Sequence, residues 1–293
     1  MLSLTIPTGS LESQLLKLFE EADLPIRRAS ERDYSANIDD PRVTKVKFLR
    51  PPEIPGAVAD GHFDLGLCET HSIREARAEV AEVMDLGPGG RAMAGHRTRL
   101  VLAMPGSSGI TRPEELPAGV RVATEFPNIT EDYFAQRGLA ARIIFSYGAT
   151  EAKIPELADA IVEITETGGS LRRAGHVILD ELVVSSLKLI ANRDAWANAE
   201  KRAAIEAIIT LLGGVLQARG KVLLKMNVPA ARLDDVIGIL PAMKAPTVSR
   251  LFGDDFYAIE TVAVKATVNL LIPELKRHGA EDILELPISK IVA

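Results

Sequence analysis

The chain has 293 residues, of which 47% are hydrophobic and 25% are charged, with 22 glycines and 17 prolines. This is the composition of a folded protein with a large core, and it excludes a disordered, collagen-like or coiled-coil chain. The formal net charge of −6 argues against nucleic acid or an anionic membrane as a partner, and the single cysteine, Cys68, excludes an intrachain disulfide.

At roughly 150 residues per domain, the length predicts about two domains with room for a small third. No basic segment or apolar core precedes Pro7, so the start does not read as a secretory signal and a cytoplasmic protein is expected. The longest uncharged apolar segment, residues 207–218, is shorter than the roughly 18 to 20 residues that span a bilayer, which predicts a buried helix.

Short apolar runs alternate with segments of helical periodicity from residue 2 to about 165, which predicts an α/β fold around mostly parallel sheets. Ser10 is expected to cap a helix over residues 11–22. Residues 87–99 are rich in Gly and Arg without an apolar period, and they are predicted as a hinge or loop. The strands of this first half are expected at residues 2–7, 43–49, 63–68 and 80–86.

The next part of the chain has the pattern of a second α/β lobe. Asn128 and Glu131 have the spacing of a capping box at the start of a helix that Gly138 ends. Residues 194–219 are predicted as one long helix returning towards the first lobe. Strands are expected at residues 98–104, 120–124, 142–147, 160–165 and 186–191.

The last 73 residues predict the order βαββαβ, which is the ferredoxin-like arrangement. A unit this small, appended to an enzyme, is typical of a regulatory or assembly module. Its strands are expected at residues 221–228, 247–252, 257–264 and 283–286, with helices opened by Pro229 and over residues 267–278.

The most informative segment, residues 158–171, reads as a strand, a loop and a helix. Thr167, Gly168, Gly169 and Ser170 combine small residues and hydroxyls at a helix N-terminus, which suits a phosphate group. An ordinary strand-to-helix turn explains the same residues, so the loop alone leaves both interpretations open.

Glu163 lies at the carboxyl end of the predicted strand, where a carboxylate beside a phosphate loop can bind sugar hydroxyls. Asp159 points to the same face, but four residues separate the two carboxyls by roughly 13 Å. We therefore assign Glu163 to a ribose and give Asp159 a structural or supporting role on the substrate side.

Residues 157–172, LADAIVEITETGGSLR, resemble the phosphoribosyl-pyrophosphate motif of the ATP phosphoribosyltransferases, the family that begins histidine biosynthesis. The resemblance covers essentially the whole chain, including the C-terminal domain of the long form. Its other blocks are residues 7–11, 48–55, 60–66, 121–128, 148–151 and 189–192, and in the tail residues 224–227, 245–248 and 286–290.

The resemblance implies two periplasmic-binding-protein-like lobes of type II plus a C-terminal ferredoxin-like βαββαβ regulatory domain. The first lobe would comprise residues 1–93 and 182–214, the second residues 94–181 with the phosphoribosyl-pyrophosphate loop, and the regulatory domain residues 220–293. It further implies transfer of phosphoribosyl from phosphoribosyl pyrophosphate to N1 of ATP with Mg²⁺ as cofactor, histidine as inhibitor, and a homo-oligomer, from dimer to hexamer.

Carried over by motif, the catalytic residues are Glu163, Glu151 and Arg50, while the Mg²⁺ ligands stay unassigned. Glu166, Thr167, Gly168, Gly169, Ser170 and Leu171 would hold the 5′-phosphate, and Thr8 and Gly9 would lie with Arg50 near ATP or pyrophosphate. The matching tail blocks assign the histidine pocket to Asn227, Thr247 and Ser249.

Three positions depart from the family pattern. Thr8 stands where Lys is common, and Glu69 and His71 replace a Gly and an acidic residue. The alternative is therefore a non-catalytic relative that binds a nucleotide or phosphosugar as a sensor or an activating subunit.

Overall fold

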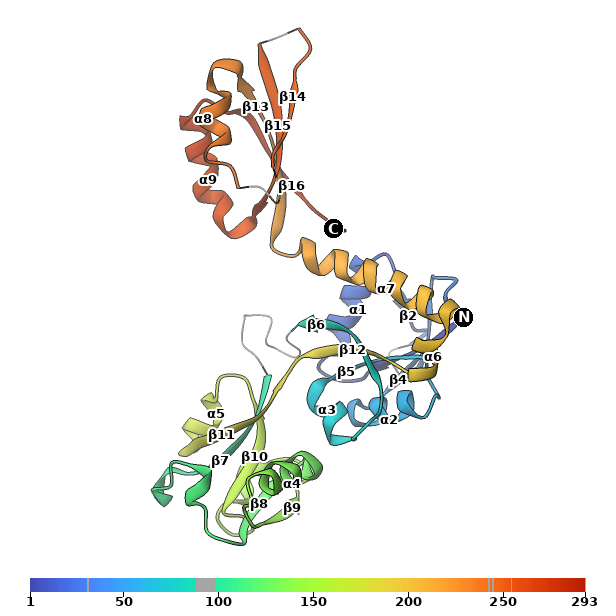
Figure 1. Cartoon of the computed structure of the whole chain (residues 1–293), viewed down its shortest axis with the longest axis vertical. Helices are drawn as coiled ribbons and strands as arrows, with labels where there is room; N and C mark the ends of the chain where they lie inside the picture. Colours follow the sequence, from blue (N-terminus) through green and yellow to red (C-terminus); the bar gives the residue numbers. More distant parts are fainter. Residues whose placement is uncertain (31, 88–97, 242, 244, 254, 293) are drawn as a thin grey trace. The chain divides into compact units, whose positions relative to one another are not determined.

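The computed structural model describes residues 1–30, 32–87, 98–241, 243, 245–253 and 255–292 (Figure 1). The chain forms two compact units, Met1–Ile209 and Thr210–Ala293. The predicted hinge falls largely on residues 88–97, which lie outside the described residues. None of the described helices combines the length and the apolar character needed to span a membrane.

The first sheet has seven strands in the order β2-β3-β4-β1-β5-β12-β6. Its centre is parallel, because β1 pairs in parallel with both β4 and β5, and β12 returns from far along the chain to run antiparallel between β5 and β6. This insertion is the type II arrangement that the family resemblance implied. The strands are β1 Leu2–Pro7, β2 Ile26–Arg27, β3 Ser35–Ile38, β4 Val43–Leu49, β5 Leu65–Glu69, β6 Ala81–Gly87 and β12 Leu187–Ala191.

Helices follow strands β1, β4 and β5 of this sheet: α1 Glu12–Glu21, α2 Ile54–Ala59 and α3 Thr70–Glu75. α2 packs closely on β5, where a Cβ atom added to Gly66 would lie 2.7 Å from Cγ2 of Val58. The buried side chains of α1 recur at helical spacing, as predicted, but Leu11 occupies the N-cap position without a side-chain hydrogen bond. The prediction that Ser10 caps this helix is therefore wrong.

The second sheet has the order β11-β7-β10-β8-β9. β8 pairs in parallel with β9 and β10, and β7 runs antiparallel between β10 and β11. The strands are β7 Thr98–Pro105, β8 Val120–Thr124, β9 Ala141–Phe145, β10 Ala160–Thr165 and β11 His176–Ser185, with helices α4 Pro127–Gln136 and α5 Gly169–Arg173. β11 was not predicted from the sequence, and the lobe boundary predicted between residues 181 and 182 falls inside that strand.

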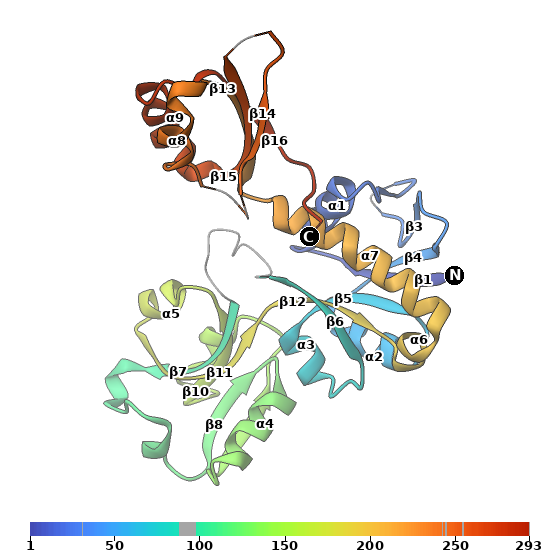
Figure 2. The same cartoon turned by 45° about the horizontal axis from the view of Figure 1, so that its top comes forward.

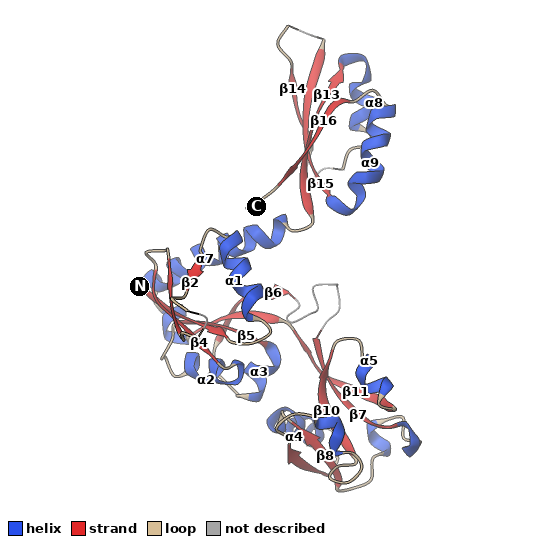
Figure 3. Cartoon of the chain, turned by 180° about the vertical axis from the view of Figure 1, so that it is seen from behind, coloured by secondary structure: helices blue, strands red, loops and turns tan. Residues whose placement is uncertain are grey.

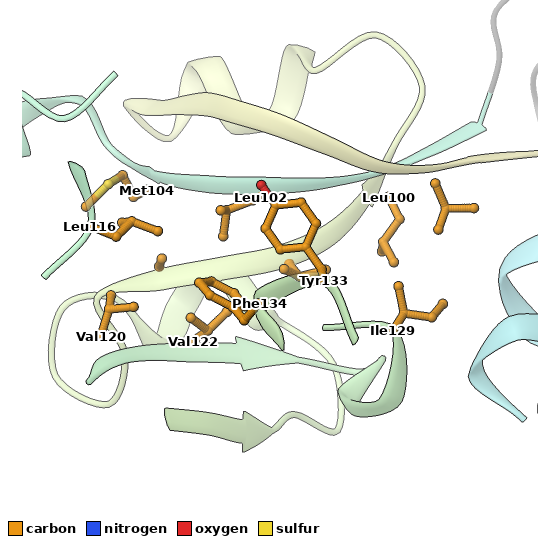
Figure 4. Close-up of a cluster of buried hydrophobic side chains, with 12 residues drawn as sticks. Leu100, Leu102, Met104, Leu116, Val120, Val122, Ile129, Tyr133 and Phe134 are labelled. Carbon is orange, nitrogen blue, oxygen red and sulfur yellow. The ribbon is translucent and has the colours of Figure 1, made fainter. Parts of the chain in front are cut away.

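Buried clusters lie on both faces of this sheet, one with Leu171 of α5 and a larger one on the side of α4, which runs beside β8 (Figure 2) and contacts β9. Leu100 and Leu102 of β7 and Val120 and Val122 of β8 meet the aromatic rings of α4 there (Figure 4). Tyr133 is 6% exposed, and its hydroxyl donates to Asp180 across 2.7 Å. The ring of Tyr133 is therefore buried in the core, while its hydroxyl is hydrogen-bonded to a carboxylate.

The capping box predicted at Asn128 and Glu131 is wrong. α4 begins at Pro127, so Asn128 lies inside its first turn, and Phe126 at the N-cap makes no side-chain hydrogen bond. Instead the carboxylate of Glu75, at the end of α3, accepts from the backbone N–H groups of Asn128 and Ile129 at 3.0 Å each. A carboxylate from another helix therefore accepts hydrogen bonds from the free backbone N–H groups at the N-terminus of α4.

The helix predicted over residues 194–219 is two helices, α6 Arg193–Ala197 and α7 Ala199–Ala218. Asn198 separates them with an extended backbone, and its side chain accepts from the N–H of Lys201. Asn192 caps α6 by accepting from two backbone N–H groups. Each of these two asparagine side chains thus accepts hydrogen bonds at the start of a separate helix, in place of one continuous helix.

The C-terminal unit contains the predicted βαββαβ order, with sheet order β14-β15-β13-β16. Its helices α8 and α9 lie on one face of the sheet (Figure 3), and alternate residues of β13 are buried against them. The elements are β13 Lys221–Pro229, α8 Leu233–Ile237, β14 Thr247–Arg250, β15 Phe256–Val264, α9 Lys265–Arg277 and β16 Glu281–Pro287.

Short 3₁₀ helices occur along the described parts of the chain. They are Pro51–Glu53, Gly106–Ser108, Pro113–Glu115, Thr150–Lys153 and Ala230–Arg232.

Candidate active site

The predicted phosphate loop joins β10 to α5. Gly168 has φ +71°, and its N–H donates to Thr165 Oγ1 across 2.8 Å. A Cβ atom at Gly168 would lie 3.0 Å from Cδ1 of Ile178 and from Nη1 of Arg172. The left-handed backbone and the close contacts both favour glycine here. The backbone of the loop therefore requires glycine at position 168.

A cavity of about 410 Å³ lies beside this loop. Its lining combines the hydroxyl-bearing residues Thr165, Thr167 and Ser170 with the guanidinium-bearing Arg173 and one carboxylate, that of Glu166. Arg99 of β7 reaches the backbone oxygen of Glu166 at 3.5 Å and the carboxylate of Glu181 at 3.2 Å. Hydroxyl donors and arginine side chains are the groups that hold a phosphate, so the composition of this cavity suits one.

Glu163 and Glu151 line one small adjoining cavity of about 90 Å³, together with Ser170. Burial raises the pKa of Glu163, and the neighbouring charges of Glu151 and Glu125 raise it further, whereas a hydrogen bond from Thr150 opposes the shift. The structure thus brings together two of the predicted catalytic residues and part of the predicted phosphate loop. Leu171 completes the lining with a side chain that is only 3% exposed.

Asp159 lies at the other end of β10. Its carboxylate accepts from the guanidinium of Arg121 at 2.7 and 3.1 Å and from the Arg121 backbone N–H at 2.9 Å. These hydrogen bonds from Arg121 lower the pKa of Asp159. Its surroundings are those of a group that ties β8 to the start of β10, and the structure does not bring it to the cavity of Glu163.

Thr8, Gly9 and Arg50 follow the carboxyl ends of β1 and β4, which are neighbours in parallel register. Thr8 donates its backbone N–H to Leu49 O at 2.8 Å, and Gly9 has φ +96°. Arg50 has an exposed side chain and donates its backbone N–H to Glu53 at 3.0 Å. The carboxyl ends of parallel strands are where open α/β sheets bind ligands.

Glu69 and His71 were noted only as departures from the family pattern. Glu69 is the last residue of β5, which lies next to β1 in the same sheet, and His71 lies in the first turn of α3. His71 Nδ1 lies 2.9 Å from Ser185 Oγ, and its Nε2 lies 3.8 Å from the Glu69 carboxylate. Burial lowers the pKa of His71 to about 4, while burial and the charge of Glu166 raise that of Glu69 to about 7. At neutral pH the His71 side chain is therefore uncharged.

The charge of Glu166, a residue of the phosphate loop, thus acts on the Glu69 carboxyl. Glu69 was not assigned to the site from the sequence. The signal available in the sequence was its place directly after the buried run Leu65–Cys68, at the carboxyl end of a strand, where polar side chains reach a sheet edge.

For a divalent metal, the described residues hold no cluster of three or more His, Cys, Asp or Glu side chains. Mg²⁺ in phosphate-transferring sites is commonly held by one or two carboxylates together with substrate phosphates. Glu151 and Glu163 in one cavity fit that requirement as oxygen donors.

The predicted histidine-binding residues share one face of the C-terminal sheet. Thr247 pairs with Glu260 and Ser249 with Ala258, and these two residues of β15 pair with Lys225 and Asn227 of β13. Because cross-strand partners point to the same side, Asn227, Thr247 and Ser249 lie on the face opposite the buried Met226 and Ile259. Asn227 Nδ2 donates to Asp282 at 2.9 Å.

Two family models match this chain, ATP phosphoribosyltransferase over residues 50–214 and "HisG, C-terminal domain" over residues 218–290. The chain is 44% identical over 291 residues to an ATP phosphoribosyltransferase of Desulforudis audaxviator (strain MP104C), covering 99% of both proteins. It is 43% identical over 292 residues to that of Chlorobium luteolum (strain DSM 273 / BCRC 81028 / 2530), covering 100% of this chain and 98% of the relative.

A solved ATP phosphoribosyl transferase (HisG:HisZ) complex from Thermotoga maritima is similar in fold, with a TM-score of 0.61 and 29% identity. The match covers 72% of this chain and 96% of that chain.

Proposed function

The chain belongs to the ATP phosphoribosyltransferase family, and from this premise we propose that it transfers phosphoribosyl from phosphoribosyl pyrophosphate to N1 of ATP. A bond forms between N1 of adenine and C1 of the ribose, and the bond from C1 to the pyrophosphate oxygen breaks. The observation that carries the proposal is the cavity of Thr165, Thr167, Ser170 and Arg173 beside the small cavity of Glu151 and Glu163.

Such a transfer requires positioning and electrostatic stabilisation of positive charge at C1 more than it requires a nucleophile. In this proposal residues 166–171 bind the 5′-phosphate, and the carboxylate of Glu163 binds the ribose hydroxyls and faces the developing positive charge. Arg50, Thr8 and Gly9 serve ATP or pyrophosphate from the first sheet. Mg²⁺, held by the substrate phosphates with Glu151 and Glu163 as available donors, would neutralise the leaving pyrophosphate.

The test is ultraviolet detection of N1-phosphoribosyl-ATP from purified protein with ATP, phosphoribosyl pyrophosphate and Mg²⁺, with pyrophosphatase added to draw the reaction forward. We expect product from the wild-type chain and at least a hundredfold less from Glu163→Gln, which keeps the side-chain size but removes the charge. Binding of phosphoribosyl pyrophosphate without any product would instead identify the sensor or activating subunit.

We further propose that histidine inhibits the enzyme through the C-terminal unit, at the sheet face of Asn227, Thr247 and Ser249. The exposed hydroxyls of Thr247 and Ser249 and the nearby Lys225–Glu260 ion pair, with 2.7 Å between its charged atoms, supply polar partners for an amino acid. Thr247→Ala should weaken inhibition by about tenfold, as expected for one lost hydrogen bond to a charged ligand.

Val248→Ala is the matched control, because Val248 pairs with the buried Ile259 and so points to the opposite face of β14. Equal histidine inhibition of wild type and Thr247→Ala would reject this pocket without affecting the proposal for catalysis.

A homo-oligomer, from dimer to hexamer, is proposed from family membership, and light scattering of the purified chain tests it. The cytoplasm is the proposed location, and the buried free thiol of Cys68 is compatible with a reducing compartment.

A further inference from the structure

Helix α3 follows β5 of the first sheet, but its two ends hold parts of the chain that lead into the second sheet. At its start, the backbone N–H of Thr70 donates to Ser186 O at 2.9 Å, and the Thr70 hydroxyl donates to the same oxygen at 3.1 Å. The N–H of His71 donates to Ser185 Oγ at 3.3 Å. Ser185 ends β11 of the second sheet and Ser186 precedes β12 of the first, so α3 holds a crossing of the chain between the sheets.

The other end of α3 holds helix α4. The two carboxylate oxygens of Glu75 accept from the backbone N–H groups of Asn128 and Ile129 at 3.0 Å each, and Asn128 Nδ2 donates to Glu75 O at 2.8 Å. Ile129 and the aromatic rings of α4 are part of the core of the second sheet. These three hydrogen bonds therefore join a helix of the first sheet to a helix that is built into the second.

Two further contacts join the same parts of the chain. The ring of His71 meets that of Phe126, the N-cap residue of α4, edge to face with 5.3 Å between the centroids. Arg77, which follows α3, pairs with Asp132 of α4 at 2.8 Å, but both side chains are more than half exposed, so this ion pair contributes little. The hydrogen bonds to Glu75 are therefore the main polar connection between the two helices.

The connection at Glu75 is favourable, yet it can open. A carboxylate that accepts from free N–H groups at a helix N-terminus gains from charge-assisted hydrogen bonds and from the helix dipole. Glu75 and Asn128 are both half-buried, so water can satisfy the same groups when the helices part, without unfolding either sheet. At Ser186, by contrast, the two sheets are joined by the covalent chain itself.

We propose that Glu75 is a positioning residue that holds the second sheet in one arrangement with the first. The residues proposed for phosphoribosyl pyrophosphate, such as Glu163, lie on the second sheet, whereas Arg50, proposed for ATP or pyrophosphate, follows a strand of the first. Glu75 touches neither substrate; it acts through the arrangement of the two sheets. The kinetic part of this inference rests on the proposed function, but the arrangement is measurable without any reaction.

The first test measures a distance between the sheets by pulsed electron paramagnetic resonance on the full-length chain. Spin labels are attached through Asp60→Cys, at the end of α2, and Ala135→Cys, on α4, because both positions are exposed while the native thiol of Cys68 is buried. We expect a narrow distance distribution when Glu75 is present and a distribution about twice as broad with Glu75→Ala, since the lost contact raises the population of other arrangements.

The second test separates binding from catalysis. Glu75→Ala should bind phosphoribosyl pyrophosphate within twofold of wild type in titration calorimetry, because the proposed site for it lies within the second sheet. The kcat of the transfer should fall by about tenfold, since misplacement of one reactant relative to the other slows the reaction even when each is bound. Glu75→Gln, which keeps one oxygen acceptor, should give an intermediate kcat.

Glu115→Ala is the matched control. The Glu115 carboxylate also accepts from two backbone N–H groups, those of Thr111 and Arg112 at 2.9 and 3.3 Å, but all three residues lie in one turn of the second lobe. This variant should change neither the distance distribution nor kcat. Asn128→Ala removes only the bond to Glu75 O and should produce a smaller change in the same direction, which keeps the proposal testable if Glu75→Ala does not fold.

An unchanged distance distribution in Glu75→Ala would overturn the positioning role, whatever the activity. A broader distribution with an unchanged kcat would overturn it as well, because the arrangement would then not matter to the reaction. A wild-type chain that forms no product would reject the proposed function, and the distance measurement alone would then decide whether Glu75 holds the two sheets.

Discussion

Glu69→Gln should stabilise the protein above neutral pH and leave its stability nearly unchanged in mild acid. The Glu69 carboxyl is a half-buried group at the end of β5, and burial together with the charge of Glu166 raises its pKa from 4.5 to about 7. Between these two values the folded chain binds more protons than the unfolded chain, so the stability contribution falls as pH rises. Above pH 7 the folded protein bears the full cost of an ionised Glu69.

The size of that cost follows from the difference between the two pKa values. At about 1.4 kcal/mol for each pH unit, the cost is about 3 kcal/mol at pH 8. The Glu69 side chain is 16% exposed, so water screens it little. Glutamine has the same shape without the charge, and the variant should gain a large part of this free energy at pH 8 and almost none at pH 4.

His71 has the opposite pH dependence. Burial lowers its pKa from 6.5 to about 4, so between these values the folded chain binds fewer protons and stability rises with pH. In the wild-type chain this rise opposes the fall due to Glu69 up to about pH 6.5. In Glu69→Gln the rise should stand alone, and stability should increase from pH 4 to 6.5 and then level off.

Urea denaturation followed by tryptophan fluorescence provides the assay, because the one tryptophan of the chain, Trp196, lies in the same unit as Glu69. Glu20→Gln is the matched control, since Glu20 is exposed on α1. A gain in stability for Glu69→Gln that is no larger at pH 8 than at pH 4, or an equal gain in the control, would refute the raised pKa of Glu69.

Two further variants test the loop and the helix caps. Gly168→Ala should destabilise the chain by about 1–2 kcal/mol because of its positive φ, and its close contacts with Ile178 should also weaken calorimetric binding of phosphoribosyl pyrophosphate. Gly109→Ala, at φ +74° with open space around it, should show the backbone cost without the binding defect. Asn192→Ala should cost about 2 kcal/mol in urea denaturation, since this side chain caps α6 and donates to two carbonyls of the α2 segment, and an unchanged midpoint would contradict the assignment.

The sequence predicted much of the architecture because its signals are local. Alternating burial in β13 and the helical spacing of apolar residues in α1 are properties of consecutive residues, and both are observed. The same holds for the phosphate loop, where Glu163 and Ser170 are close along the chain and line the same cavity. Resemblance to a family extended these signals to the whole chain, including the C-terminal βαββαβ unit.

The wrong and missed predictions have three different causes. Asn128 matched a capping box, but Glu75 of another helix satisfies that N-terminus. The long helix predicted after residue 194 is interrupted at Asn198 by a side-chain cap, a competition that apolar spacing does not reveal. β11 was missed because its exposed and half-buried residues follow no strict alternation, and two register shifts interrupt its pairing with β7.

What the sequence by itself determined is therefore the class of fold, the family and the residues of the loop between β10 and α5. Only the tertiary structure decided which polar groups meet across the chain, such as His71 with Ser185, 114 residues apart. The physical reason is that hydrogen bonds and the pKa values of buried carboxyls depend on distances of a few ångströms between side chains, and these distances exist only once the sheets have formed.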